Sequence, residues 1–259
     1  MVVIPSAEIL ETWRKFNDFP METLTKAWYF HKGTSTKQRE VSLMKEHRHQ
    51  YGITGNCFDL ALWLLDEFKK DGISAFLIGS RFHTEHAHVA VVALDNQGNR
   101  FLCDLGDQWL CPIMIETRNE DYTNDRLRGF FPGADIQVQP EKNNSVEILY
   151  HRPNGKFSKQ VFNLHPIEMN DFLLGAEYSQ NLIRPKPLFE CRVPYQEETA
   201  HWEFYNWESF LSTNIGLHKE DQTEDIHHWV NVIHQKANYN KEFLFDALTK
   251  YTSIQGEDS

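Results

Sequence analysis

Three residues in the central part of the chain have the side chains of a cysteine nucleophile and its activating partners. Cys57 stands in G-N-C-F-D-L-A-L-W-L-L, His88 opens the apolar run H-V-A-V-V-A-L, and Asp104 lies in R-F-L-C-D-L. A thiol becomes a strong nucleophile when an imidazole takes its proton, and a carboxylate can hold that imidazole in position. The three residues therefore predict covalent catalysis by a Cys-His-Asp triad.

The segment around Cys57 has the spacing of a helix that is buried on most sides. Its apolar face carries Leu60, Trp63, Leu64 and Phe68. Thr54 or Asn56 can cap its N-terminus, and Gly72 can end it. Cys57 would then lie in the first turn, where unbonded amide groups and the helix dipole favour a negatively charged sulfur.

His88 and Asp104 are expected to meet across a pair of strands. A β-prone run, I-S-A-F-L-I, follows Gly72, and two further runs, 88–94 and 100–105, flank the turn signal D-N-Q-G-N. Counting outward from this turn places the start of one strand beside the end of the other. Asp104 can then accept a hydrogen bond from one imidazole nitrogen while the other nitrogen faces Cys57. Cys103 would point to the opposite face, into the core.

The order and context of these residues resemble the arylamine N-acetyltransferases, within the transglutaminase-like group of cysteine enzymes. That family carries R-G-G-x-C-x-E, a histidine opening an apolar strand, and a D-x-G motif. This chain has I-T-G-N-C-F-D, H-V-A-V-V and C-D-L-G-D-Q-W-L-C-P. On this match Cys57, His88 and Asp104 correspond to the family's triad, and Gly106 and Pro112 to the residues after its acid. Roughly the central three-fifths of the chain follows the family's order.

The chain also departs from the family signature. Ile53 and Thr54 stand where the family has arginine and its first glycine, and Asp59 stands in place of the glutamate. The upstream Pro-Phe-Glu-Asn segment, the usual partner of that arginine, has no match. The chain is thus identified as a divergent member.

The resemblance implies an α+β fold with a cysteine-proteinase-like core in three parts. Residues 1–72 would form a helical segment carrying the nucleophile. Residues 73–165 would form an antiparallel, β-barrel-like segment with His88 and Asp104. Residues 166–259 would form a mixed α/β segment or lid, with helices near 166–175 and 225–251.

The resemblance also implies an activity. An acetyl group would pass from acetyl-CoA, as co-substrate, to a small-molecule amine through an acyl-cysteine, with ping-pong kinetics. No glycine-rich phosphate loop locates the CoA pocket. Two alternatives remain open: a transglutaminase-like hydrolase or amidase that does not use CoA, and a noncatalytic relative of the fold. The oligomeric state also remains open.

The composition and net charge indicate which kinds of partner and which cellular compartment are expected. The 259 residues carry a formal net charge of −11, which argues against nonspecific nucleic-acid binding. No apolar run is long enough to span a membrane, and the first residues do not have the pattern of a signal peptide. The four cysteines include no C-x-x-C pair, so neither a disulfide framework nor a structural zinc site is indicated. A cytoplasmic protein is expected.

The other histidines of F-H-T-E-H-A-H are alternatives to the triad assignment. His83, His86 and His88 could ligate zinc, but residues so spaced before a strand do not converge unless the loop bends sharply. No metal is therefore expected. His86 is the alternative base if the strand begins earlier than His88.

Overall fold

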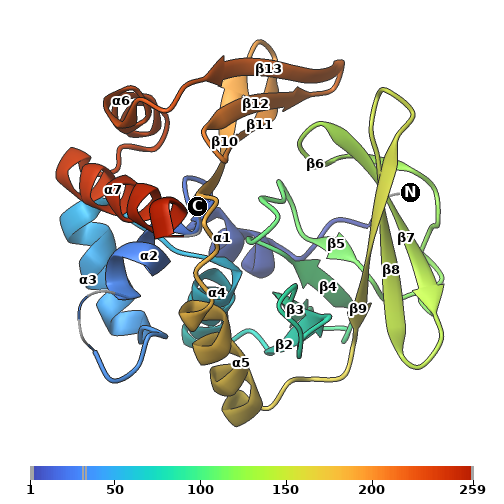
Figure 1. Cartoon of the computed structure of the whole chain (residues 1–259). Helices are drawn as coiled ribbons and strands as arrows, with labels where there is room; N and C mark the ends of the chain where they lie inside the picture. Colours follow the sequence, from blue (N-terminus) through green and yellow to red (C-terminus); the bar gives the residue numbers. More distant parts are fainter. Residues whose placement is uncertain (1–2, 31, 33, 258–259) are drawn as a thin grey trace.

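The computed structural model describes residues 3–30, 32 and 34–257 and has the α+β fold that was expected. The N-terminal part contains α1 (Ala7–Arg14), α2 (Leu24–Phe30), α3 (Val41–Tyr51) and α4 (Cys57–Lys70). Helix α4 packs against β2 and β3 of the adjoining sheet (Figure 1). The nucleophile candidate thus begins a helix that contacts the strand carrying His88.

An eight-stranded antiparallel sheet curls into a nearly closed, barrel-like middle segment. Its strands run β5-β4-β3-β2-β9-β8-β7-β6. In chain order they are β2 (Ala75–Ser80), β3 (His88–Leu94), β4 (Arg100–Cys103), β5 (Ile113–Met114), β6 (Leu127–Phe131), β7 (Ala134–Glu141), β8 (Ser145–His151) and β9 (Phe157–Asn163). Strand β3 begins at His88, as its apolar run predicted.

The C-terminal part builds a second sheet, and a short N-terminal strand joins it. After α5 (Met169–Asn181), the order across the sheet is β1 (Met21–Glu22), β10 (Leu188–Tyr195), β11 (Glu198–Tyr205), β12 (Glu208–Thr213) and β13 (Gly216–Gln222). The helices α6 (Ile226–Ala237) and α7 (Lys241–Glu257) follow. The expected segment boundaries near residues 72 and 165 fall between elements and remain predictions.

Two of the expected helices differ from those observed. The helix expected over 166–175 begins at Met169 and continues to Asn181. The helix expected over 225–251 is two helices, because Asn238 adopts a left-handed conformation with φ 57° and ends α6. Asparagine tolerates this conformation better than most residues, so it serves here as a helix stop.

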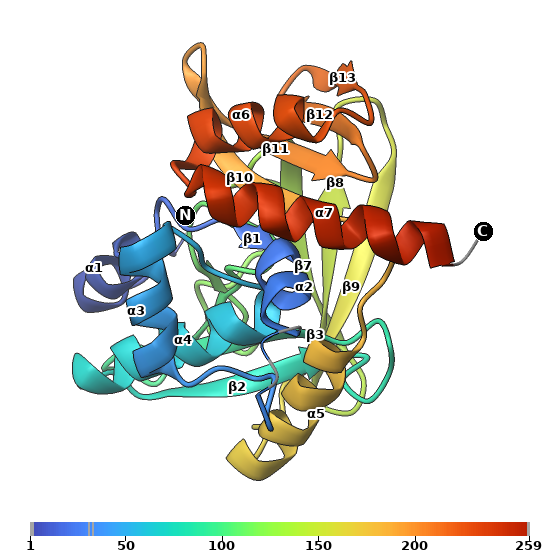
Figure 2. The ribbon, with the colours of Figure 1, turned by 60° about the vertical axis from the view of Figure 1, so that its left-hand side comes forward.

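The molecule has two hydrophobic cores. One lies between α1, α4 and the barrel-like sheet; the other lies between the second sheet and α2, α6 and α7. Figure 2 shows α6 and α7 beside the second sheet, with α2 next to α7. Trp202 and Phe204 on β11 are fully buried in the second core. None of the helices in the described part of the chain combines the length and apolarity that a membrane span requires.

Candidate active site

Cys57 is the first residue of α4, and Asn56 caps that helix. The Asn56 side chain accepts hydrogen bonds from the Phe58 and Asp59 amides at 3.0 and 3.3 Å, and Asp59 accepts one from the Asn56 amide at 3.3 Å. This reciprocal arrangement is a capping box, with aspartate as the third residue. The cap uses two amides of the first turn, which leaves the Cys57 amide as a candidate donor to an oxyanion.

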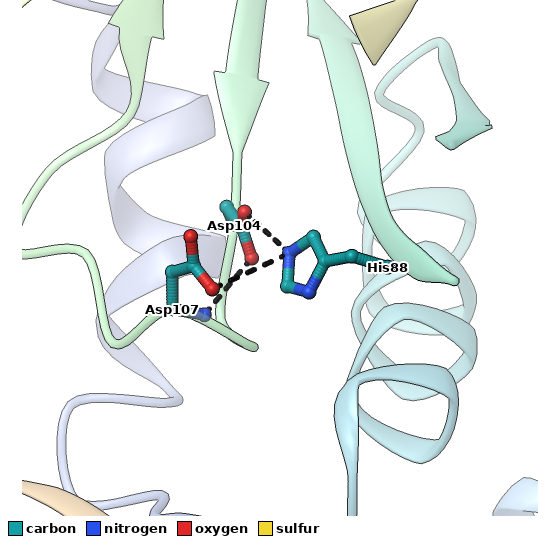
Figure 3. Close-up of side chains that lie close together, drawn as sticks. All are labelled: His88, Asp104 and Asp107. Atoms are coloured by element: carbon teal, nitrogen blue, oxygen red, sulfur yellow. Dashed lines mark hydrogen bonds and ion pairs between the residues drawn. The ribbon is translucent and has the colours of Figure 1, made fainter. Parts of the chain in front are cut away.

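His88 and Asp104 lie together at the open end of the β3–β4 ladder. Strands β3 and β4 pair Val91 with Cys103, so Asp104 follows the last paired residue of β4. The His88 Nε2 atom is 2.7 Å from Asp104 Oδ2 (Figure 3). Asp104 is fully buried, whereas 14% of the His88 side chain is exposed. The backbone register therefore accounts for the pair that was expected from the sequence.

Cys57 approaches the same turn from the helix side. A Cβ atom added to Gly106 would lie 2.7 Å from Cys57 Cβ and 2.7 Å from His88 Cε1, so the backbone there is in close contact with both. The Cys57 thiol is among the groups that raise the pKa of His88. The structure thus brings all three candidate residues to one turn, with the imidazole between sulfur and carboxylate.

A second carboxylate, absent from the sequence-based assignment, also faces His88. Asp107 Oδ1 is 3.7 Å from His88 Nε2. The backbone amide of Asp107 donates a hydrogen bond to Asp104 Oδ1 at 3.1 Å. Tyr150 donates its hydroxyl to Asp107 Oδ2 at 3.0 Å. Burial would lower the pKa of His88, but the two carboxylates outweigh it and raise that pKa well above its ordinary value. In the sequence, the signal that could have identified Asp107 was its close spacing to Asp104 in the stretch D-L-G-D.

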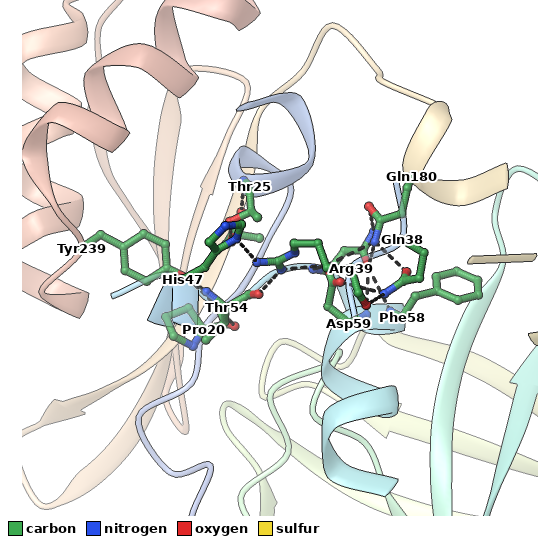
Figure 4. Close-up of polar contacts among 12 residues, drawn as sticks. Pro20, Thr25, Gln38, Arg39, His47, Thr54, Phe58, Asp59, Gln180 and Tyr239 are labelled. Carbon is green, nitrogen blue, oxygen red and sulfur yellow. Dashed lines mark hydrogen bonds and ion pairs between the residues drawn. The ribbon is translucent and has the colours of Figure 1, made fainter. Parts of the chain in front are cut away.

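Arg39 forms a buried ion pair beneath the first turn of α4. Its Nη2 atom is 3.2 Å from Asp59 Oδ2, and both side chains are almost fully buried. Arg39 also donates to the Thr54 carbonyl, and Gln38 donates to Asp59 Oδ1 at 3.0 Å (Figure 4). A guanidinium therefore supports this turn, although it comes from a different position than the arginine of the family signature. The signature position holds Ile53, which is buried and apolar. Sequence reasoning missed Arg39 because it lies in a charged run without clear periodicity.

Replacing Arg39 by methionine is expected to lower the free energy of unfolding by about 3–5 kcal/mol, because it leaves the Asp59 carboxylate buried and unpaired. Urea unfolding of Arg39→Met, Asp59→Asn and the double variant measures this loss. The double variant should be more stable than the sum of the two single losses implies. A loss below about 1 kcal/mol for Arg39→Met would contradict this role of the pair.

The other two histidines of the loop contact residues outside the triad. His83 and His86 are both exposed, and His86 lies 3.2 Å from Arg184 and 3.4 Å from Glu85. Strand β3 begins after His86, so the condition for His86 as an alternative base is not met.

His88 and Asp104 of the candidate triad, together with Asp107, have the spacing of metal ligands. Among the described residues, one group could hold a metal ion, and it consists of His88, Asp104 and Asp107 with ligand atoms within 4.8 Å of one another. The His88–Asp104 hydrogen bond already accounts for this spacing, because it uses the Nε2 atom that a metal would need. The absence of a metal remains a prediction.

Two cavities lie beside the Gly106 turn. The cavity on the carboxylate side has a volume of about 470 Å³ and is lined by Asp107, whereas the cavity on the cysteine side is lined by Cys57. The cavity on the cysteine side has a volume of about 510 Å³ and is bordered by Cys57, Lys26, Arg184 and Lys186, together with Leu182 and Tyr205. Burial lowers the pKa of Lys26 to about 8. The cysteine side therefore combines a thiol with three basic side chains.

No family model matches the sequence, and no curated protein matches it significantly. Solved structures do match. An arylamine N-acetyltransferase from Mycobacterium marinum has a TM-score of 0.74 at 11% identity, over 97% of this chain and 94% of that one. The same enzyme in complex with CoA has a TM-score of 0.69 at 10% identity, over 90% and 88% of the two chains.

A third structure agrees with these two. The arylamine N-acetyltransferase from Salmonella typhimurium has a TM-score of 0.69 at 11% identity, over 92% of this chain and 89% of that one. Each match spans nearly the whole of both chains, so the similarity includes the helical part, the barrel-like part and the second sheet. The chain therefore has the fold of the arylamine N-acetyltransferases, as the sequence resemblance implied.

Proposed function

We propose that the protein is an acyltransferase that moves an acetyl group from acetyl-CoA to an amine through an acyl-Cys57 intermediate. The observation that carries this proposal is the convergence of Cys57, His88 and Asp104 on the Gly106 turn, with 2.7 Å between His88 Nε2 and Asp104 Oδ2. The full-length similarity to arylamine N-acetyltransferase structures supports it, and one of those structures holds CoA.

In the first half-reaction, His88 holds the Cys57 proton and the thiolate attacks the thioester carbonyl carbon of the donor. The new carbon–sulfur bond forms as the bond to the CoA sulfur breaks, and the imidazolium returns the proton to the departing thiolate. The amide of Cys57 is the candidate donor to the oxyanion in this step. Asp104 stabilises the imidazolium and fixes its orientation.

In the second half-reaction, an amine attacks the acyl-cysteine. His88 now removes a proton from the amine nitrogen, the carbon–sulfur bond to Cys57 breaks, and the product amide leaves. The proton taken from the amine stays on His88 and Cys57 leaves as the thiolate, so the enzyme returns to its starting state. Because the donor product leaves before the acceptor reacts, ping-pong kinetics follow.

The cysteine-side cavity is assigned to the donor. Lys26, Arg184 and Lys186 surround it, and their positive charge suits the phosphate groups of CoA. Glu85 is the one acidic residue among the residues that line this cavity, and its carboxylate lies 3.6 Å from Arg184. The cavity thus offers a basic surface and the nucleophile together.

The value of kcat/KM for acetyl-CoA is expected to fall as pH rises through about 8. Burial depresses the pKa of Lys26 to about 8, so Lys26 is charged below that pH and neutral above it. A neutral Lys26 no longer attracts the phosphates. Lys26→Met should lower kcat/KM by about tenfold near neutral pH and should remove this fall.

The matched control for this prediction is Lys32→Met, which removes the same charge from an exposed residue just beyond α2. Its pH profile should follow that of the unmodified protein. An unchanged profile in Lys26→Met would contradict the assignment of this cavity to the donor.

The function is tested by measuring free CoA released from acetyl-CoA with and without an amine. Release that requires the amine, with parallel lines in double-reciprocal plots, supports the acyltransferase. Release at the same rate without an amine would indicate a thioester hydrolase instead. No release, with Cys57 still rapidly alkylated at mildly acidic pH, would indicate a thiol hydrolase or amidase that uses another substrate. No release and an unreactive Cys57 would indicate a noncatalytic relative.

A further inference from the structure

Helix α5 carries a glutamine at a position where its buried face is otherwise apolar. Phe172, Ala176 and Gln180 recur at every fourth residue and are all buried, with 3% of Gln180 exposed. Residues at this spacing share one face of a helix. A buried amide costs free energy unless its polar atoms find partners, and a leucine or methionine would fill the position without that cost. Packing alone therefore does not explain the glutamine.

The buried face of α5 lies against the first turn of α4, which begins at Cys57. The rings of Phe172 and Phe58 pack with their centroids 5.5 Å apart. Further along α5, Gln180 Oε1 accepts a hydrogen bond from Asn56 Nδ2 at 3.2 Å, and Gln180 Nε2 donates to Asn56 Oδ1 at 3.3 Å. The two side-chain amides thus form a reciprocal pair at the cap of α4.

The Gln180 amide also reaches the residues around this cap. Its Nε2 atom donates to Gln38 Oε1 at 3.0 Å and to Asp59 Oδ2 at 3.2 Å (Figure 4). On the preceding turn of α5, the Glu177 carboxylate accepts hydrogen bonds from the two backbone amides before Arg39, at 2.8 to 2.9 Å. Helix α5 therefore holds both the cap of α4 and the segment that supplies Arg39.

The Asn56 side chain determines how α4 begins. Its Oδ1 atom accepts from the Phe58 and Asp59 amides, while its Nδ2 atom points to Gln180. Asn56 is only 5% exposed, so loss of Gln180 would leave this NH₂ group buried without that acceptor. The cost of an unsatisfied buried donor favours reorientation of the side chain. The cap, and with it the direction of Cys57, would then change.

The same end of α5 borders the cavity on the cysteine side. Ser179 and Leu182 line this cavity and stand on either side of Gln180 in the sequence. Asn56 and Cys57 line the cavity from the start of α4. One helix end thus supports both the wall of the proposed donor cavity and the cap of the helix that carries the nucleophile.

We propose that Gln180 is a positioning residue for acyl transfer. It holds Asn56, and Asn56 holds the first turn of α4 so that the Cys57 sulfur lies beside His88. This inference rests on the proposed function and adds a residue that acts on the orientation of the thiolate. A displacement of a reacting group by about 1 Å can lower a rate by about 100-fold, so the rate of attack should depend on this support.

The test measures the rate of acetyl-Cys57 formation in the full-length protein as a function of acetyl-CoA concentration. In Gln180→Met, which keeps the length of the side chain but removes its amide, the rate at saturation is expected to fall about 10- to 100-fold. The half-saturating concentration should change by less than about threefold. Gln50→Met is the matched control, because Gln50 is an exposed glutamine of α3, and both of its values should equal those of the unmodified protein.

An unchanged saturated rate in Gln180→Met would overturn the proposal. A loss confined to the half-saturating concentration would overturn it as well, since damage to the donor cavity produces that result. Gln180→Leu is measured in parallel, so one variant remains if the other does not fold.

The route through Asn56 is tested by combining two substitutions. If Gln180 acts through Asn56, the double variant Asn56→Ala/Gln180→Met should be acetylated within about threefold of the rate of Asn56→Ala alone. Losses that multiply in the double variant would show that Gln180 acts by another route and would contradict the proposal.

Alkylation of Cys57 by iodoacetamide, followed by peptide mass analysis, separates this inference from the proposed function because it needs no acetyl-CoA. The rate at mildly acidic pH depends on the thiolate that His88 maintains, whereas the rate at strongly alkaline pH depends mainly on access to the sulfur. The ratio of the two rates should fall about tenfold in Gln180→Met and stay constant in Gln50→Met. An unchanged ratio in Gln180→Met would overturn the role of Gln180 even if acetyl-CoA acetylates the protein. A lowered ratio without acetylation of the unmodified protein would retain that role and reject the proposed function.

Discussion

Replacing Cys57 by serine is expected to reduce acetyl transfer by on the order of 10⁴-fold or more, because the acyl-cysteine can no longer form and a serine hydroxyl is a far weaker nucleophile here. The side chain is only partly buried and serine is nearly the same size, so the fold should be retained. The measurement is the rate of amide formation from acetyl-CoA with a saturating amine.

Cys111→Ser is the matched control for this variant. Cys111 is also a partly buried free cysteine, and it lies outside the Gly106 turn that Cys57 contacts. Its rate should equal that of the unmodified protein. If Cys57→Ser kept more than about a tenth of the rate, an acyl-cysteine intermediate would be excluded.

Replacing Asp104 by asparagine is expected to lower kcat/KM by about 10²- to 10⁴-fold. The buried carboxylate accepts the hydrogen bond from His88 Nε2 and stabilises the positive charge that the imidazole acquires during the reaction. It also contributes to raising the pKa of His88, so this pKa should fall in the variant. The measurement is kcat/KM as a function of pH.

Asp121→Asn serves as the control, because Asp121 is exposed and lies well after the Asp104 turn in the chain. It should leave kcat/KM unchanged. In the unmodified protein Asp107 Oδ1 lies 3.7 Å from His88 Nε2, so in the Asp104 variant Asp107 is expected to keep part of the favourable field. A loss smaller than about threefold in Asp104→Asn would mean that this carboxylate does not act through His88.

The sequence could predict the local elements because each carries its own signals. Thr54 and Asn56 were both candidate caps, and the structure uses Asn56, which directly precedes Cys57. The valine-rich run after His88 and the turn before Arg100 similarly located β3 and β4. The close approach of His88 and Asp104 follows from that hairpin.

Features that depend on contacts distant in sequence could not be read this way. Helix α3 separates Arg39 from Asp59 in the sequence, and the local pattern around neither residue indicates that the two form an ion pair. Strand β1 pairs Met21 with Glu190, so a segment expected to be helical contributes to the C-terminal sheet. The cavity on the carboxylate side of the Gly106 turn is lined by residues from both sheets. Asp107 and Glu190 are far apart in the sequence, and only the folded chain brings them to this cavity.

The central claim is that Cys57 carries an acyl group, and intact-mass analysis after incubation with acetyl-CoA tests it most directly. The account predicts one acetyl adduct that is absent from Cys57→Ser and is discharged when an amine is added. No adduct on the unmodified protein, or an adduct that persists in Cys57→Ser, would contradict the account.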